Sequence, residues 1–284
     1  MEFRFNEREE AFRREVEAFL SSALPPDWAL KNIRWPGGYG SGGYQGSNGL
    51  EVYDVSGKYR EKKAWVQSPG FDGEVKDDIL DILTRYRKLL IEKGWNTISW
   101  PKEYGGREYT YMEQAIFDER TSYYGAPAIG VISGGMVAPT ILRVGTEAQK
   151  KKWIPRIAAD EISMWLGYSE PNAGSDLAGI QTTAVQDGDE YVINGQKVWS
   201  SGAHVCDYAW LIVRTDPSAP VHKGASFFLV DMESPGITVR PLQNILGNHH
   251  YCEVFFDNVR VPAENLVGEK NRGFYQVVNQ LDYE

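Results

Sequence analysis

The spacing of apolar residues changes once along the chain, near residue 160, and this change restricts the possible folds more than any other feature. Before this point apolar residues recur every three or four positions, which is typical of amphipathic helices. After it they alternate with polar residues, which is typical of half-buried strands. Helices followed by strands predict an α+β fold with a helical domain and a β-domain. The 284 residues have room for both.

The first 160 residues are predicted to be mainly helical. Helices are expected to begin near Glu7 and to cover residues 77–93, 111–123 and 136–143. Asn6 is a suitable N-cap for the first helix. Thr146 precedes Gln149 by three positions, which is the pattern of a capping box. Between residues 32 and 73 a Gly-rich segment lacks sustained periodicity, so we interpret it as a long insertion.

The region after residue 160 is predicted to form seven short strands, over residues 181–185, 190–194, 196–200, 208–215, 225–231, 237–242 and 252–257. Asp187-Gly188 and Asn194-Gly195 predict hairpin turns. Strands of this length and spacing predict a small antiparallel β-barrel or sandwich. The predicted domains are therefore 1–160, helical; 161–272, β; and 273–284, the beginning of a further helical domain. Because the last helix has only begun when the sequence stops, we expect the chain to be truncated.

Composition excludes several classes of protein. A net charge of −9 argues against a nucleic-acid-binding protein, which needs a basic surface. No apolar run approaches the roughly 18 residues of a membrane span, and the acidic N-terminus does not resemble a targeting signal, so a cytoplasmic protein is expected. Cys206 and Cys252 are interpreted as buried, inert thiols. The four histidines, including His249-His250, show no metal-ligand spacing, so no metal is expected.

Two segments of the β-region have the residue types needed to hold a flavin: Leu166-Gly-Tyr-Ser-Glu-Pro-Asn-Ala-Gly-Ser-Asp176 and Asn194-Gly-Gln-Lys-Val-Trp-Ser-Ser201. Backbone amides and hydroxyls suit the polar edge of the flavin ring, and an indole suits its face. A Gly-Ser turn suits a pyrophosphate, because glycine lets the backbone approach closely. Taken alone, the second segment is better explained by a buried strand tryptophan with hairpin serines.

The two segments resemble the signature of the acyl-CoA dehydrogenase family. Further motifs occur in the order that this family shows: Trp100-Pro-Lys-Glu-Tyr-Gly-Gly106, Gly145-Thr-Glu-Ala-Gln-Lys150, Thr182-Thr-Ala, Asp257-Asn-Val-Arg-Val-Pro262 and Leu281-Asp-Tyr-Glu284. The resemblance covers the whole chain apart from the insertion. It implies FAD as cofactor, an acyl-CoA thioester as substrate, electron-transfer flavoprotein as electron acceptor, and a homo- or hetero-tetramer.

The resemblance also implies which residues bind FAD: Leu166, Gly167, Tyr168, Ser169, Gly174, Ser175, Trp199 and Ser201. The segment 166–169 would approach the pyrimidine edge of the ring through backbone amides, with the Ser169 hydroxyl as a further donor. Gly174 and Ser175 would meet the pyrophosphate. Trp199 would pack on the flavin, and Ser201 would bind near its N5.

The implied reaction removes an α-proton from the thioester, for which a carboxylate desolvated against the flavin is suited. Most members of the family place this glutamate late in the C-terminal domain. Isovaleryl-CoA-type and steroid side-chain enzymes place it on the first helix after the β-domain, and that position matches Glu284. The alternative for Glu284 is a structural glutamate.

Several stretches, including Ser201-Gly-Ala-His204 and Arg214-Thr-Asp-Pro217, look most like actinobacterial enzymes that oxidise steroid side-chain CoA thioesters, often as α₂β₂ heterotetramers. Three alternatives to a catalytic dehydrogenase stay open. The first is a non-catalytic partner subunit, and the second is a flavin oxidase or monooxygenase of the same fold. The third is a β-barrel that binds a small ligand beneath a helical cap.

Overall fold

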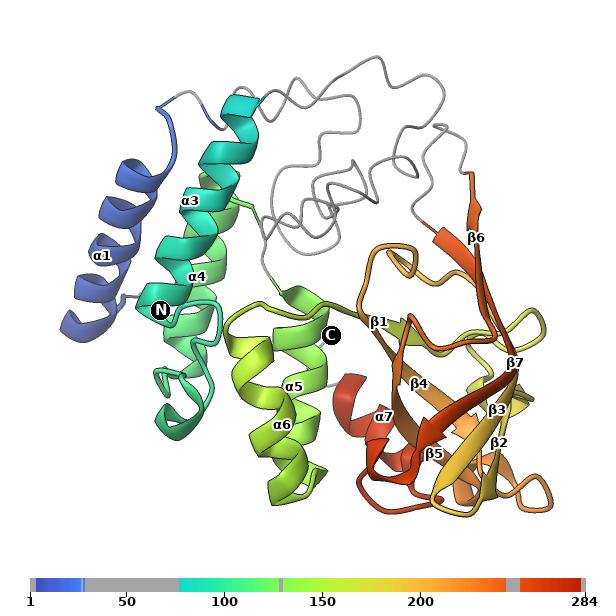
Figure 1. Cartoon of the computed structure of the whole chain (residues 1–284). Helices are drawn as coiled ribbons and strands as arrows, with labels where there is room; N and C mark the ends of the chain where they lie inside the picture. The colour runs from blue at the N-terminus through green and yellow to red at the C-terminus, as the bar shows by residue number, and fades with distance from the viewer. Residues whose placement is uncertain (1–3, 27, 29–76, 128–129, 244–250, 282–284) are drawn as a thin grey trace. The chain divides into compact units, whose positions relative to one another are not determined.

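The computed structural model describes residues 4–26, 28, 77–127, 130–243 and 251–281 (Figure 1). The predicted insertion at 32–73, His249-His250 and Glu284 lie outside these residues. The described chain forms two compact units, which divide between Val131 and Ile132. The domain boundaries expected from the sequence stay a prediction.

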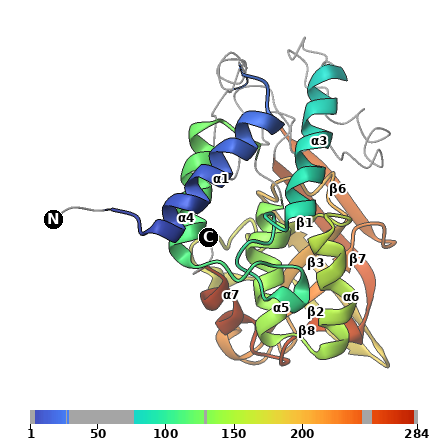
Figure 2. The same ribbon diagram turned by 90° about the vertical axis from the view of Figure 1, so that its left-hand side faces the viewer.

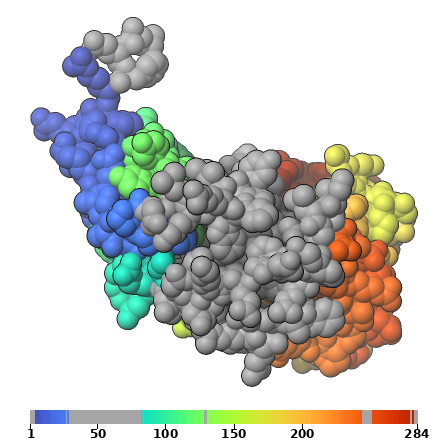
Figure 3. All heavy atoms as spheres, turned by 90° about the horizontal axis from the view of Figure 1, so that it is seen from above, coloured from blue at the N-terminus to red at the C-terminus, as the bar shows by residue number. Residues whose placement is uncertain are grey.

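The first unit consists of the helices α1 (Glu7–Ala23), α3 (Asp77–Lys93) and α4 (Tyr111–Tyr123). As predicted, α1 is capped by Asn6, whose side chain accepts from the Glu9 backbone N–H while the Glu9 carboxylate accepts from the Asn6 N–H. Helices α1 and α4 lie side by side (Figure 2), and the atoms of α1, in blue, lie against green atoms of α4 in Figure 3.

Aromatic side chains form the core of the first unit. The Trp95 ring meets Phe12, Phe19 and Phe117 edge-on, at centroid distances of 5.7, 5.1 and 5.7 Å. The apolar stripe of α1 that the sequence predicted, which includes Val16, is buried in this core. The predicted helices of this unit are confirmed.

The second unit begins with a π-helical turn, Ser133–Val137, followed by α5 (Ala138–Val144) and α6 (Glu147–Ala158), and it ends with α7 (Gly273–Leu281). The predicted capping box of Thr146 and Gln149 begins α6. The Gln149 amide also donates to the carbonyls of Glu264 and Leu266, at 2.8 and 2.6 Å, and so attaches α6 to the β-region. No helix in the described ranges of either unit is long and apolar enough to cross a membrane.

One eight-stranded sheet follows the helices. Its strands are β1 (Met164–Gly167), β2 (Thr183–Asp187), β3 (Glu190–Lys197), β4 (Tyr208–Arg214), β5 (Ala225–Asp231), β6 (Ile237–Leu242), β7 (Tyr251–Pro262) and β8 (Leu266–Val267). The order is β6-β7-β3-β2-β4-β5-β8, with β1 beside β4. Neighbours are antiparallel except that β1 and β2 run parallel to β4. The predicted fold class is confirmed, but β6 and β8 do not pair among the described residues, so the sheet is not closed.

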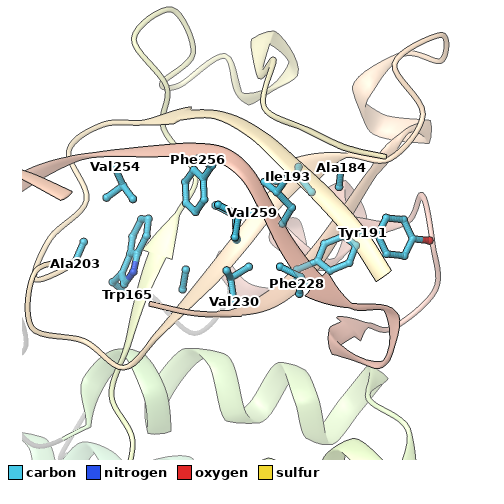
Figure 4. Close-up of a cluster of buried hydrophobic side chains, with 14 of the residues drawn as sticks. Trp165, Ala184, Tyr191, Ile193, Ala203, Phe228, Val230, Val254, Phe256 and Val259 are labelled. Atoms are coloured by element: carbon cyan, nitrogen blue, oxygen red, sulfur yellow. The ribbon is translucent and has the colours of Figure 1, made fainter. Parts of the chain in front are cut away.

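The sheet encloses one apolar core and contributes to a second. Side chains such as Ile193 of β3, Phe228 of β5 and Val254 of β7 meet on its inner side (Figure 4). Strands β4 and β5 are buried on both faces, because α7 covers the other side of β5. On that side Trp210 and Phe227 stack with their centroids 4.5 Å apart.

The predicted hairpin turn at Asn194-Gly195 is wrong. Strand β3 continues to Lys197, and its register with β7 shifts between Ile193 and Gly195, where two residues of β7 (257–258) face one residue of β3 in a β-bulge. The physical reason is the length of β7, whose 12 residues pair along both halves of β3 and satisfy its backbone groups. Next to the bulge Gly195 has φ +149°, and a Cβ there would lie 2.5 Å from Thr182 Oγ1.

Replacing this glycine should destabilise the second unit. Gly195→Ala is expected to lower the free energy of unfolding by about 1–3 kcal/mol, because the new Cβ meets Thr182 in a strained backbone conformation. Gly135→Ala is the matched control, since its Cβ would meet no atom within 4 Å. Urea unfolding of both variants tests the expectation, and equal stabilities would contradict the bulge.

Candidate functional site

A buried ion pair connects the end of β3 with the segment that follows β1. Lys197, the last residue of β3, is fully buried, and its Nζ donates to the Glu170 carboxylate at 2.8 Å and to the Tyr168 carbonyl at 3.1 Å. Burial lowers the pKa of Lys197 to about 8, while the Glu170 charge opposes this shift. The ammonium therefore stays charged at neutral pH, and the two strand ends are held together.

Glu170 joins a third segment to the same point. Its carboxylate also accepts from the backbone N–H groups of Gln181 and Thr182, at 2.6 and 3.1 Å, immediately before β2. Burial alone would raise the pKa of Glu170, but the Lys197 charge and these hydrogen bonds outweigh it, so the pKa lies below its ordinary value of 4.5. One carboxylate thus fixes the segments after β1, before β2 and at the end of β3.

Trp199 projects outward just beyond this ion pair. It has φ +59°, its side chain is 62% exposed, and its ring meets Tyr251 edge-on at 6.0 Å. The next residue, Ser200, is buried and exchanges two backbone hydrogen bonds of 3.1 Å with Cys252. A left-handed conformation of a non-glycine residue costs about 1–3 kcal/mol and is concentrated at functional sites. The exposed indole is therefore a candidate ligand contact.

Along the segments 166–170 and 197–201, some hydrogen-bond donors are bound within the protein and others have no partner among the described residues. Val198 N–H donates to the Ser169 carbonyl at 2.9 Å, which places the segments side by side. Among the described residues, the N–H and hydroxyl of Ser169, the indole N–H of Trp199 and the hydroxyl of Ser201 make no hydrogen bond. Their neighbours Glu170 and Ser200 are fixed by the contacts above. The arrangement presents donors and an aromatic ring on a rigid support.

The remaining predicted residues of the first segment have packing roles as well. Leu166 and Gly167 belong to β1 and pair with Trp210 and Leu211 of β4. A Cβ at Gly167 would lie 2.5 Å from the end of the Leu211 side chain, so Leu211 would have to shift to admit any larger residue. The Tyr168 side chain is directed into the protein, where its ring contacts Phe227 edge-on at 5.8 Å. The Tyr168 hydroxyl is therefore not available to a flavin.

Gly174 and Ser175 lie on an exposed loop after the short bridge between Glu170 and Ala173. A Cβ at Gly174 would meet no atom within 4 Å, so no described neighbour requires a glycine there. Close approach of an outside group is one reason for a glycine at such a position. The structure brings 166–170 and 197–201 together, whereas no described contact joins Gly174-Ser175 to Trp199 or Ser201.

Sequence reasoning missed three contributors to this site. Lys197 and Glu170 stood within the quoted motifs, and a lysine at an inward position of a strand signals a buried partner. No role was predicted for His204, whose Nδ1 lies 3.2 Å from Cys252 Sγ. Burial raises the pKa of Cys252 to about 11, which agrees with the prediction of an inert thiol. No metal-binding cluster occurs in the part of the chain that the structure describes.

Comparisons with known proteins identify the family. Residues 74–161 match the acyl-CoA dehydrogenase N-terminal domain, and residues 166–259 match the acyl-CoA dehydrogenase middle domain. The chain belongs to the acyl-CoA dehydrogenase family. The two matched regions contain the helices α3, α4, α5 and α6 and most of the sheet, including every residue of the candidate site except Glu284.

Relatives of this acyl-CoA dehydrogenase chain occur in Mycobacterium tuberculosis. Acyl-CoA dehydrogenase FadE26 is 43% identical over 205 residues, covering 70% of this chain and 51% of the relative. Acyl-CoA dehydrogenase IpdE1 is 32% identical over 278 residues, covering 97% of this chain and 62% of the relative. The chain thus spans about half to three fifths of the length of these relatives.

Solved structures of the family share the fold. The Tcur3481-Tcur3483 steroid ACAD superposes with a TM-score of 0.74 at 33% identity, covering 100% of this chain and 62% of that one. The ChsE4-ChsE5 complex from Mycobacterium tuberculosis has a TM-score of 0.73 at 32% identity, with the same coverage.

Removing the lysine of the ion pair should cost far more than removing both charges. Lys197→Met is expected to lower the free energy of unfolding by about 3–5 kcal/mol, because Glu170 is left buried without its cation. Adding Glu170→Gln should restore part of this loss, since the amide oxygen can still accept from the Gln181 N–H. Urea unfolding at pH 7 measures both.

Acid should remove the same stabilisation. Because the folded-state pKa of Glu170 lies below 4.5, its contribution is complete above that pH and is lost as the pH falls below it. Arg260→Ala, which removes an exposed pair with Glu190, is the control and should change stability little. If Lys197→Met resembled this control, the pair would not hold the site together.

Proposed function

We propose that this chain carries the flavin-binding part of an FAD-dependent acyl-CoA dehydrogenase, which introduces a double bond between Cα and Cβ of an acyl-CoA thioester. Membership of the family supports the reaction class. The observation that carries the proposal concerns the segments 166–170 and 197–201, which the Lys197–Glu170 ion pair holds together (the tied segments). In them Ser169, Trp199 and Ser201 present hydrogen-bond donors without a partner among the described residues, and the Trp199 indole is exposed. These groups match the polar edge and the aromatic face of an isoalloxazine ring.

The residues of this chain would hold FAD in three places. The backbone of 166–169 and the Ser169 hydroxyl would bind the pyrimidine edge of the ring. Trp199 would pack on the ring, and Ser201 would bind near N5. Gly174 and Ser175 would receive the pyrophosphate, for which an exposed glycine without neighbours is suited. When bound, the flavin supplies the acceptor for the β-hydride.

Glu284 is the proposed base that takes the α-proton onto a carboxylate oxygen. It follows Leu281, the last residue of α7, by three positions. A carboxylate excluded from water next to the ring has a raised pKa, and it can then accept a proton from a weak carbon acid. In this proposal the base and the ring donors come from two different segments of the chain and act on the same bond of the substrate.

A bulky or steroid side-chain thioester is the proposed substrate class. The support is the likeness to proteins described as a steroid ACAD and as the ChsE4-ChsE5 complex. We further propose electron-transfer flavoprotein as electron acceptor and a homo- or hetero-tetrameric assembly, as the resemblance implies, and a cytoplasmic location, as the composition of the N-terminal segment suggests.

A non-catalytic partner subunit is the second candidate function. It is favoured by the likeness to the ChsE4-ChsE5 complex, which contains two named components. In that case the donors of Ser169 and Ser201 complete only part of a flavin site, and the base lies on the other subunit. The two candidates differ in whether Glu284 is needed for reduction of bound flavin.

Anaerobic titration with acyl-CoA thioesters tests the proposal. The purified protein should show a flavin absorption spectrum that bleaches with one class of thioester, a steroid side-chain form included in the panel. Glu284→Gln should keep the flavin and slow bleaching by roughly 10²- to 10⁴-fold, the usual contribution of a general base.

Glu264→Gln is the matched control, because Glu264 is an exposed glutamate paired with Lys152 far from the tied segments in sequence. This control should bleach at the rate of the unsubstituted protein. Bleaching that survives in Glu284→Gln would contradict the role of Glu284. Bound flavin that no thioester bleaches would favour the partner subunit.

A further inference from the structure

Gln280 of α7 lies at the centre of a buried hydrogen-bond network. Its side chain is fully buried, and its Oε1 accepts from the Tyr168 hydroxyl at 2.6 Å and from the Trp210 indole at 2.8 Å. The indole N–H can only donate, so the carboxamide oxygen, rather than its nitrogen, must face Trp210. The orientation of Gln280 is therefore determined, and the Tyr168 hydroxyl donates to the same oxygen.

This network fixes Tyr168 from the side opposite to the ion pair. The Tyr168 carbonyl accepts from Lys197 Nζ at 3.1 Å, while its hydroxyl is bound to Gln280. Between these two points its ring packs on Phe227, which itself stacks on Trp210. Both ends of the residue that precedes Ser169 are thereby held.

We propose that Gln280 is a positioning residue for the flavin site: through Tyr168 it holds the backbone that presents the Ser169 donors. The inference rests on the proposed function, since it assigns these donors to the ring edge. Gln280 also precedes the proposed base Glu284 by four positions. The same side chain thus connects the helix that leads to the base with the segment that meets the flavin.

If Gln280 only stabilises the fold, its replacement affects the flavin differently than if it positions the donors of Ser169. Donors at the pyrimidine edge stabilise the negative charge of reduced flavin, so misplaced donors make reduction less favourable. A residue that only stabilises the fold changes the unfolding transition and leaves the reduction potential of bound FAD unchanged. The potential and the FAD dissociation constant are therefore the informative measurements.

The experiment is a double-mutant cycle on the holoprotein expressed from its natural gene. Tyr168→Phe and Gln280→Leu should each raise the Kd of FAD about three- to tenfold, the value of one buried hydrogen bond, and shift the reduction potential to more negative values. The double variant should bind FAD no more weakly than Gln280→Leu, because Gln280→Leu already removes the hydrogen bond that Tyr168→Phe removes, together with the one from Trp210. If Gln280→Leu fails to fold, Tyr168→Phe alone carries the test.

Tyr191→Phe is the matched control, because it removes another tyrosine hydroxyl of the same unit, bonded to Gln186 at 3.3 Å. It should leave the Kd and the potential of FAD unchanged. If the unsubstituted protein binds FAD and both Tyr168→Phe and Gln280→Leu match this control, the inference is overturned and the proposed function stands. If the unsubstituted protein binds no FAD, the proposed function is overturned and the inference with it.

Discussion

The rest of the candidate site depends on the ion pair between Lys197 and Glu170. Removing two charges from water is costly, and their attraction compensates only where geometry and further hydrogen bonds are good. Here the pair is 2.8 Å long, and the Tyr168 carbonyl and two backbone N–H groups occupy remaining positions around it. Either partner alone would be an uncompensated buried charge, so the three chain segments have one low-energy arrangement.

That arrangement explains how an exposed tryptophan can be kept in an unfavourable conformation. Trp199 gains little burial from folding, since it is largely exposed and its ring meets only the edge of Tyr251 among the described aromatic rings, yet its φ is positive. Its neighbour Val198 donates to the Ser169 carbonyl, its neighbour Ser200 is paired with Cys252 of β7, and these bonds over-determine the backbone between them. Such preorganisation means that a ligand meets donors already in place, and binding then orders little of the protein.

The sheet is built to support this site from behind. Strands β4 and β5 are buried on both faces, and Trp210 of β4 stacks on Phe227 of β5 on the side that α7 covers. Tyr168 and Gln280 meet in that layer. The helix α7 therefore does more than cover apolar surface, because its fully buried Gln280 binds Tyr168, the residue that precedes Ser169. Fold and site share the same contacts.

The sequence by itself determined the helix starts, most strands and the flavin-type segments, because capping, periodicity and turn residues act over a few positions. Asn6 and Thr146 begin their helices as expected. Tertiary structure decided what depends on distant partners. Asn194-Gly195 stayed within β3, opposite a bulge of β7, because β7 is long enough to pair along both halves of β3, and a local turn signal carries no information about β7. The burial of Lys197, its pairing with Glu170 and the contact of Gln280 with Tyr168 join residues 27 and 112 positions apart. Such pairings follow from how strands and helices pack, and no local pattern encodes them.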